Sequence, residues 1–189
     1  MVTTVDTPAI DGFAPALRRL YFVRFTFALV WAALVFLTTK SGLGPAGIVL
    51  VLVYPLFDVG AAVVDARSAK GAGPVRGLYV NMAISLLATI GVGVAAASGI
   101  PAVLRVWGAW AIVAGLVQLI VGVARRGMGG QWPMILSGGI SVLAGANFVL
   151  SASVANPALS GVAGYAVLGG IFFLASAIRL GRAAKGELT

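Results

Sequence analysis

The distribution of charge constrains this chain most, because no Asp, Glu, Lys or Arg occurs between Gly127 and Ile178. So long an uncharged stretch lacks the polar side chains that coat the surface of a soluble domain. The bias extends to the whole chain, in which 60% of the residues are hydrophobic and 10% are charged. We therefore expect lipid to be the solvent for most of the chain, and a water-soluble globular enzyme is excluded.

Apolar runs of about 20 residues are long enough to cross the hydrocarbon layer as helices. Six such runs occur, and we expect membrane spans at residues 17–38, 45–66, 77–98, 101–124, 132–152 and 157–180. The predicted fold is an all-α membrane protein with one transmembrane domain. It covers residues 17–182, with short tails at 1–16 and 183–189.

Basic residues collect at alternate ends of the runs, and such ends usually lie in the cytoplasm. The basic ends contain Arg18, Arg19, Arg67, Lys70, Arg76, Arg125, Arg126, Arg179, Arg182 and Lys185, and the other ends contain Lys40 and Arg105. We therefore predict a multi-pass protein of a bacterial cytoplasmic membrane with both termini in the cytoplasm. No nucleic-acid-binding motif accompanies the basic residues, so the expected partners are anionic lipid headgroups and not nucleic acid.

Internal repetition is visible in the even-numbered runs. Prolines recur every 56 residues at their starts, at Pro45, Pro101 and Pro157, and glycines recur every 55 residues near their middles, at Gly60, Gly115 and Gly170. Each unit contains two spans, so successive units enter the membrane in the same direction. The prediction is three tandem parallel helical hairpins, at about residues 17–66, 77–124 and 132–180.

The repeated unit is clearest in GGQWPMILSGGISVLAGANFVLS and GYAVLGGIFFLASAIRLGR, with LRVWGAWAIVAGLVQLIVGVARR next. Over roughly residues 18–182, this pattern resembles the short repeat of the HdeD family of bacterial membrane proteins. The resemblance implies six spans in the cytoplasmic membrane and a part in acid resistance. The family has no established catalytic residues, so the resemblance assigns no role to any residue of this chain.

Small residues form stripes on the predicted helices, and such stripes let helix backbones approach closely in lipid. The stripes comprise Gly108, Gly115 and Gly122; Ala163, Gly170 and Ala177; and Ser137, Ser141 and Gly145, with Gly60 as a further small residue in mid-span. We expect them to pack helices within one molecule. The alternative is an interface of a homo-oligomer.

Arg24 and Asp58 are expected at similar depths in adjacent antiparallel spans, where an unpaired ion would cost several kcal/mol. The sequence therefore predicts that they pair, either as a structural salt bridge or as a protonatable or ion-binding site. Pro55 adds to the second interpretation, because it frees a backbone carbonyl one turn earlier. Nearer the membrane edge, Asp65 is expected to pair with Arg18 and Arg19.

Other polar side chains in the spans are expected to form hydrogen bonds between helices. These are Asn81, Gln118 and Asn147. Among the tryptophans, Trp107 and Trp132 are expected at the membrane interface because they lie near span ends. The deeper Trp31 and Trp110 are expected in the packing between helices.

The residue types that are missing restrict the chemistry. The chain contains no Cys, no His and only five carboxylates, so we expect no metal site, no cofactor and no catalytic nucleophile with its base. The function predicted from the sequence is a non-catalytic membrane protein of the HdeD type, acting in membrane stress or acid tolerance. The alternatives are a small-solute or proton pathway that uses Asp58 and Arg24, and an assembly partner of a membrane complex.

Overall fold

The computed structural model describes residues 13–68, 76–124, 132–183 and 186, and these residues form helices without any strand. The helices are α1 (Phe13–Thr38), α2 (Pro45–Ser68), α3 (Arg76–Ala96), α4 (Ile100–Ala124), α5 (Trp132–Ser151) and α6 (Ser160–Ala183). Each of the six is long and apolar enough to cross a membrane. The prediction of an all-helical, multi-span membrane protein is confirmed.

The helix boundaries follow the prolines at two of the three predicted places. Pro45 is the first residue of α2 and Pro101 the second residue of α4, where a proline costs no helical hydrogen bond. Pro157 differs, because α6 begins only at Ser160. The connection at 152–159 therefore includes Pro157, and the two helices that it joins pack sparsely against each other.

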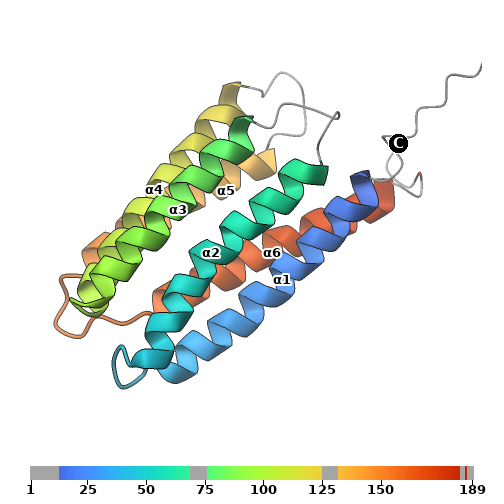
Figure 1. The fold of residues 1–189 in the computed structure, drawn as a ribbon. Helices are drawn as coiled ribbons and strands as arrows, with labels where there is room; N and C mark the ends of the chain where they lie inside the picture. Colours follow the sequence, from blue (N-terminus) through green and yellow to red (C-terminus); the bar gives the residue numbers. More distant parts are fainter. Residues whose placement is uncertain (1–12, 69–75, 125–131, 184–185, 187–189) are drawn as a thin grey trace, which may run out of the picture.

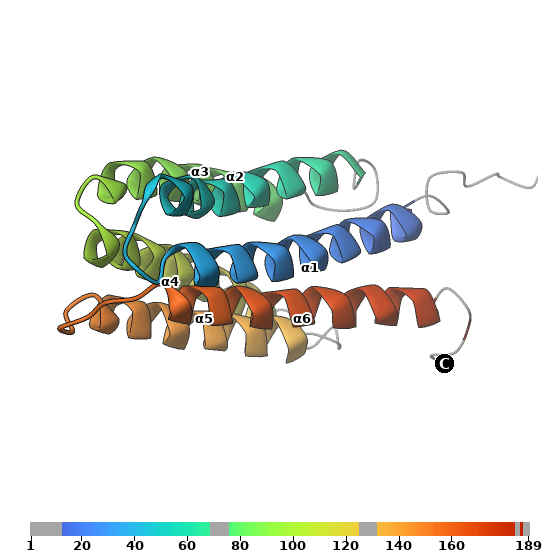
Figure 2. The same ribbon diagram turned by 90° about the horizontal axis from the view of Figure 1, so that it is seen from below.

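The six helices run along one common axis and form a closed ring in chain order (Figures 1 and 2). The most extensive packing joins α4 to α5, α1 to α6 and α2 to α3. The start of α1 and the end of α6 lie at the same end of the bundle, which we call the terminal end (Figure 1). The opposite end contains the connections at 39–44, 97–99 and 152–159, and we call it the hairpin end.

The buried apolar core lies in the half of the bundle toward the hairpin end. Its centre is an aromatic cluster in which Trp31 stacks on Trp107 with ring centroids 5.4 Å apart. Tyr54 lies 4.6 Å from the Trp31 ring and 5.3 Å from the Trp107 ring. Around these rings pack aliphatic residues from five helices, including Val35, Val51, Val92, Leu104 and Val162. The centre of this half of the ring is therefore occupied by side chains.

Trp107 corrects one expectation from the sequence. It is fully buried and does not lie at a membrane interface. It is seven residues into α4, on the face that it shares with Leu104 and Ala111, and that face points into the ring. Trp132, at the start of α5, is 78% exposed, as an interfacial tryptophan should be.

Helices α4 and α5 meet along a glycine seam formed by Gly108, Gly115, Gly138 and Gly145. A Cβ atom on Gly108 would lie 2.6 Å from the carbonyl oxygen of Gly145, and a Cβ on Gly145 would lie 2.6 Å from that of Gly108. Gly115 and Gly138 repeat this arrangement at 2.7 and 2.8 Å. The two backbones are in direct contact, so no larger residue fits at these four positions.

The other predicted packing residues have different environments. In α6, Ala163 and Ala177 are buried, and a Cβ on Gly170 would lie 3.2 Å from the Cβ of Ala28 in α1. In α5, Ser141 is buried and Ser137 is half-buried. Gly122 belongs to α4, but its surroundings lie outside the described residues.

Gly60 is not a packing residue, contrary to the expectation. It is exposed, and no atom would lie within 4 Å of a Cβ placed on it. Gly60 follows Asp58 by two residues, which turns it about 200° around the helix. Because Asp58 faces α1 and α3, Gly60 faces outward.

Candidate functional site

Asp58 lies inside the bundle on α2, ten residues before the end of that helix, which is roughly 15 Å along its axis. Arg24 of α1 lies at a similar level. The Nη1 atom of Arg24 is 3.3 Å from Oδ1 of Asp58, and the two side chains are 13% and 20% exposed. The structure thus brings together the two charged residues that the sequence singled out, on neighbouring helices.

The second carboxylate oxygen of Asp58 accepts two hydrogen bonds from α3. Asn81 donates through Nδ2 at 2.8 Å and Ser85 donates through Oγ at 2.7 Å, both to Oδ2. Ser85 is fully buried, and its backbone carbonyl accepts a hydrogen bond of 2.8 Å from Thr89 Oγ1. We call Arg24, Asp58, Asn81 and Ser85 the Asp58 network; it joins α1, α2 and α3.

Ser85 is the member of this network that the sequence analysis missed. The signal was present, because Asn81 and Ser85 are four residues apart and share one face of a helix. Serine is also a common small residue in packed membrane helices. Its bond to a carboxylate therefore becomes evident only once α3 is known to face α2.

Arg24 also contacts a fourth helix. Its guanidinium carbon lies 4.9 Å from the centre of the Phe173 ring on α6, within the range of a cation–π interaction. Its Nε atom is buried and has no hydrogen-bond acceptor among the described residues. The side chain is therefore held between Asp58 on one side and an aromatic ring on the other.

The second predicted pair does not form. Among the described residues, neither Arg18 nor Arg19 has a carboxylate within salt-bridge distance, and Asp65 is half-buried in α2. The Arg18 guanidinium instead lies 5.5 Å from the Phe22 ring centre. It also packs beside Gly181 of α6, where a Cβ would approach Arg18 Nε to 3.0 Å. Arg18 therefore points toward α6 and away from Asp65 on α2.

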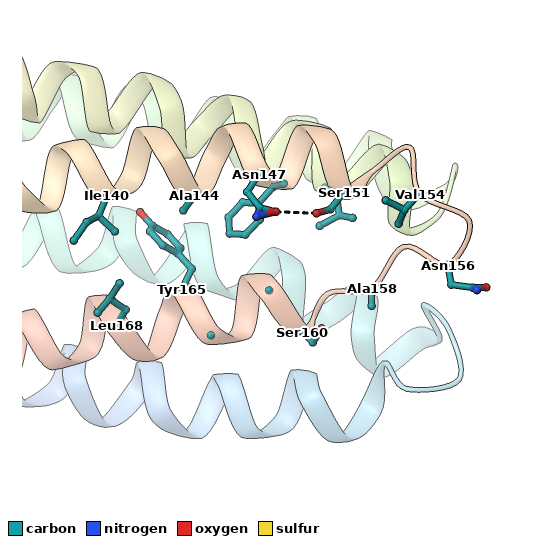
Figure 3. Close-up of a pocket in the computed structure, with 14 residues that line it drawn as sticks. Ile140, Ala144, Asn147, Ser151, Val154, Asn156, Ala158, Ser160, Tyr165 and Leu168 are labelled. Atoms are coloured by element: carbon teal, nitrogen blue, oxygen red, sulfur yellow. Dashed lines mark hydrogen bonds between the residues drawn. The ribbon is translucent and has the colours of Figure 1, made fainter.

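The remaining predicted polar contacts also differ. Asn147 is exposed and accepts a 2.9 Å hydrogen bond from Ser151 in its own helix, so it does not bond across helices (Figure 3). Gln118 is half-buried on α4 and forms no hydrogen bond with the described residues. The bond between α5 and α6 is instead the 2.8 Å contact of Ser141 Oγ with Tyr165 Oη.

A pocket of about 480 Å³ lies between α5 and α6 and extends to the connection at the hairpin end (Figure 3). Its polar lining consists of amide and hydroxyl groups, from Asn147, Ser151, Asn156, Ser160 and Tyr165. Among the residues that the structure describes, no charged side chain lines it. The Asp58 network contains the ion pair found among the described residues, and it is therefore the candidate functional site.

The chemistry open to this site is that of one carboxylate and its donors. The described residues contain no group of three or more His, Cys, Asp or Glu side chains that could hold a metal ion. Comparisons with protein-family models, with curated proteins and with solved structures give no match to this chain. The function must therefore be argued from the network itself.

Proposed function

We propose that this chain is a non-catalytic protein of the HdeD type in a bacterial cytoplasmic membrane, that it acts in tolerance of acid or membrane stress, and that Asp58 is its proton-responsive residue. The observation that carries the proposal is the Asp58 network, in which one carboxylate accepts bonds from both α1 and α3. Its ionisation state therefore decides how three helices are held together.

The ionised and protonated forms of Asp58 have different effects on these helices. The ionised carboxylate pairs with Arg24 and accepts the Asn81 and Ser85 bonds. Protonation removes the ion pair and leaves the largely buried Arg24 charge without a counter-ion, which is costly in a membrane. Acid is thus expected to loosen α1 from α2 and α3 toward the terminal end.

The orientation proposed for the bundle places this response in the cytoplasm. The excess of basic residues at the terminal end supports that side as cytoplasmic. The proposed three-hairpin repeat is supported by Gly115 and Gly170, which are 55 residues apart in the sequence. Gly115 packs on the backbone of α5 and Gly170 packs on α1, so each contacts the next helix around the ring.

The rival function is a proton pathway through the bundle, which the 20% exposure of Asp58 favours. The packing opposes it, because the aromatic and aliphatic core occupies the centre of the bundle beyond the network. No polar residue of the network continues through that half. We therefore expect a response to protons without transport of protons.

The experiment compares acid survival of a strain that lacks the gene and carries the wild type, Asp58→Asn or Asp65→Asn. We expect the wild type and Asp65→Asn to restore survival and Asp58→Asn to fail, at equal amounts of protein in the membrane. Asp65 is the matched control because it lies on the same helix and forms no ion pair with the described residues. Restoration by Asp58→Asn would refute the role of Asp58.

Proton flux in reconstituted liposomes distinguishes the proposed function from the rival proton pathway. With a pH-sensitive dye inside and a potassium diffusion potential imposed, we expect proton flux at the level of empty liposomes for all three proteins. Flux through the wild type that disappears in Asp58→Asn would replace the proposed function with a proton pathway.

A further inference from the structure

A long apolar trench runs along the outward face of α1, separate from the Asp58 network and from the pocket between α5 and α6. Its volume is about 770 Å³. Its floor is formed by residues of successive turns of α1, and Phe57 of α2 closes one side. Phe27 stacks on Phe57 with ring centroids 3.7 Å apart, so this wall is a fixed pair of rings.

The trench changes character along its length. Toward the middle of the bundle its lining is almost entirely apolar, with Phe22, Val23 and Val30 on either side of Thr26. At the terminal end it reaches Arg18 and Arg19, which are both exposed and have no carboxylate within salt-bridge distance among the described residues. Two positive charges therefore lie at the mouth of the trench, which is the end of the trench nearest the terminal end of the bundle.

The Arg18 side chain is held in place at this mouth. Its guanidinium packs against the Phe22 ring at 5.5 Å and against the backbone at Gly181 of α6. A guanidinium presents several N–H donors in a planar fork that matches the oxygens of a phosphate. The mouth is thus suited to the phosphate of a lipid, and its two positive charges favour a headgroup with net negative charge over a zwitterionic one.

We propose that this trench is a binding site for one anionic phospholipid of the leaflet at the terminal end, with its phosphate at Arg18 and Arg19 and an acyl chain along Phe22, Thr26 and Val30. Charge complementarity selects the headgroup, and the apolar floor accepts the chain. Arg24 is not part of this site, because it faces Asp58 on the inner side of α1.

The test uses the full-length protein in detergent and counts bound lipid by native mass spectrometry. The probes are phosphatidylglycerol and phosphatidylcholine with the same acyl chains. The wild type should retain phosphatidylglycerol in preference to phosphatidylcholine. The double variant Arg18→Gln/Arg19→Gln should bind phosphatidylglycerol more weakly, by about fivefold for each arginine removed, and should lose the preference.

Two further variants distinguish a specific lipid-binding site from nonspecific attraction of anionic lipids to basic residues. Thr26→Trp fills the trench without changing the charge, and it should reduce the binding of both lipids. Arg179→Gln/Arg182→Gln removes two exposed arginines of α6 near the same end and should leave binding unchanged. The proposal is overturned if the α6 variant reduces phosphatidylglycerol binding as much as the α1 variant, or if Thr26→Trp has no effect.

Discussion

Asp58 uses both carboxylate oxygens, one for the Arg24 ion pair and the other for two donors on α3. An acceptor within lipid depth has no water to replace a lost partner, so each of these bonds resists separation of the helices. The two side chains are only 13% and 20% exposed, so each charge relies on the other as its counter-ion.

Replacement of Asp58 by Asn should lower the free energy of unfolding by about 2 kcal/mol, because the Arg24 charge loses its counter-ion. Chemical or thermal unfolding in detergent would measure this. An equal loss in Asp65→Asn would show that the effect is not specific to the network.

Ser85→Ala tests the α3 side of the network. Removing one hydrogen bond to a charged acceptor should cost about 1–2 kcal/mol, and the carboxylate would remain paired with Arg24. Ser176→Ala is the matched control, because within the described part of the chain the Ser176 hydroxyl bonds only to the Phe172 carbonyl of its own helix. Unfolding of the two variants under identical conditions should show a clear loss only for Ser85→Ala.

The residues that stand out by charge could be identified from the sequence. The contacts that depend on which face of a helix packs against its neighbour could not. Arg24 and Asp58 could be matched by depth alone, since both are ions within apolar runs. Asp65 could not, because the direction of the Arg18 side chain is set by Phe22 and by α6. The rotation of a helix about its axis depends on packing that a single sequence does not display.

At the scale of the helices, the glycine seam determines how closely α4 and α5 approach. Gly138→Ala would place a Cβ 2.8 Å from both the Gly115 carbonyl oxygen and the Leu119 nitrogen. Because both are backbone atoms, the helices must separate, at a cost of about 1–3 kcal/mol. Gly139→Ala, one residue along, meets nothing within 4 Å and should be neutral or slightly stabilising. An equal free energy of unfolding for the two variants would contradict the role of the glycine seam.

Helix extent was the most predictable property at this scale, because hydropathy and chain length determine it. The predicted spans and the six helices agree to within four residues at every end, with the largest differences at the start of α1 and at both ends of α6. The small-residue stripe correctly placed Gly115 on a helix contact, whereas the packing role expected for the mid-span Gly60 was wrong. The inward face of α2 is occupied by Asp58 at this level, so Gly60 is turned outward.

The molecule as a whole has two unlike halves, an apolar core toward the hairpin end and the ion pair nearer the terminal end.

The proposed orientation can be tested directly, because the chain contains no cysteine. Ser153→Cys lies in the exposed connection between α5 and α6, whereas Arg182→Cys lies near the end of α6. In intact cells, a membrane-impermeant maleimide should label the first and not the second; the reverse pattern would invert the orientation.

The aromatic cluster provides the protein with its own optical reporter. Trp31 and Trp107 are stacked, and Trp110 lies 5.1 Å from Trp107, whereas Trp132 is 78% exposed. Near-ultraviolet circular dichroism, which senses fixed aromatic packing, should therefore report mainly on the half toward the hairpin end. A quencher attached to a lipid should reduce mainly the fluorescence of Trp132. If acid loosens only the Asp58 network, the dichroism should persist while the helices separate at the other end, and one label-free spectrum would distinguish local opening from global unfolding.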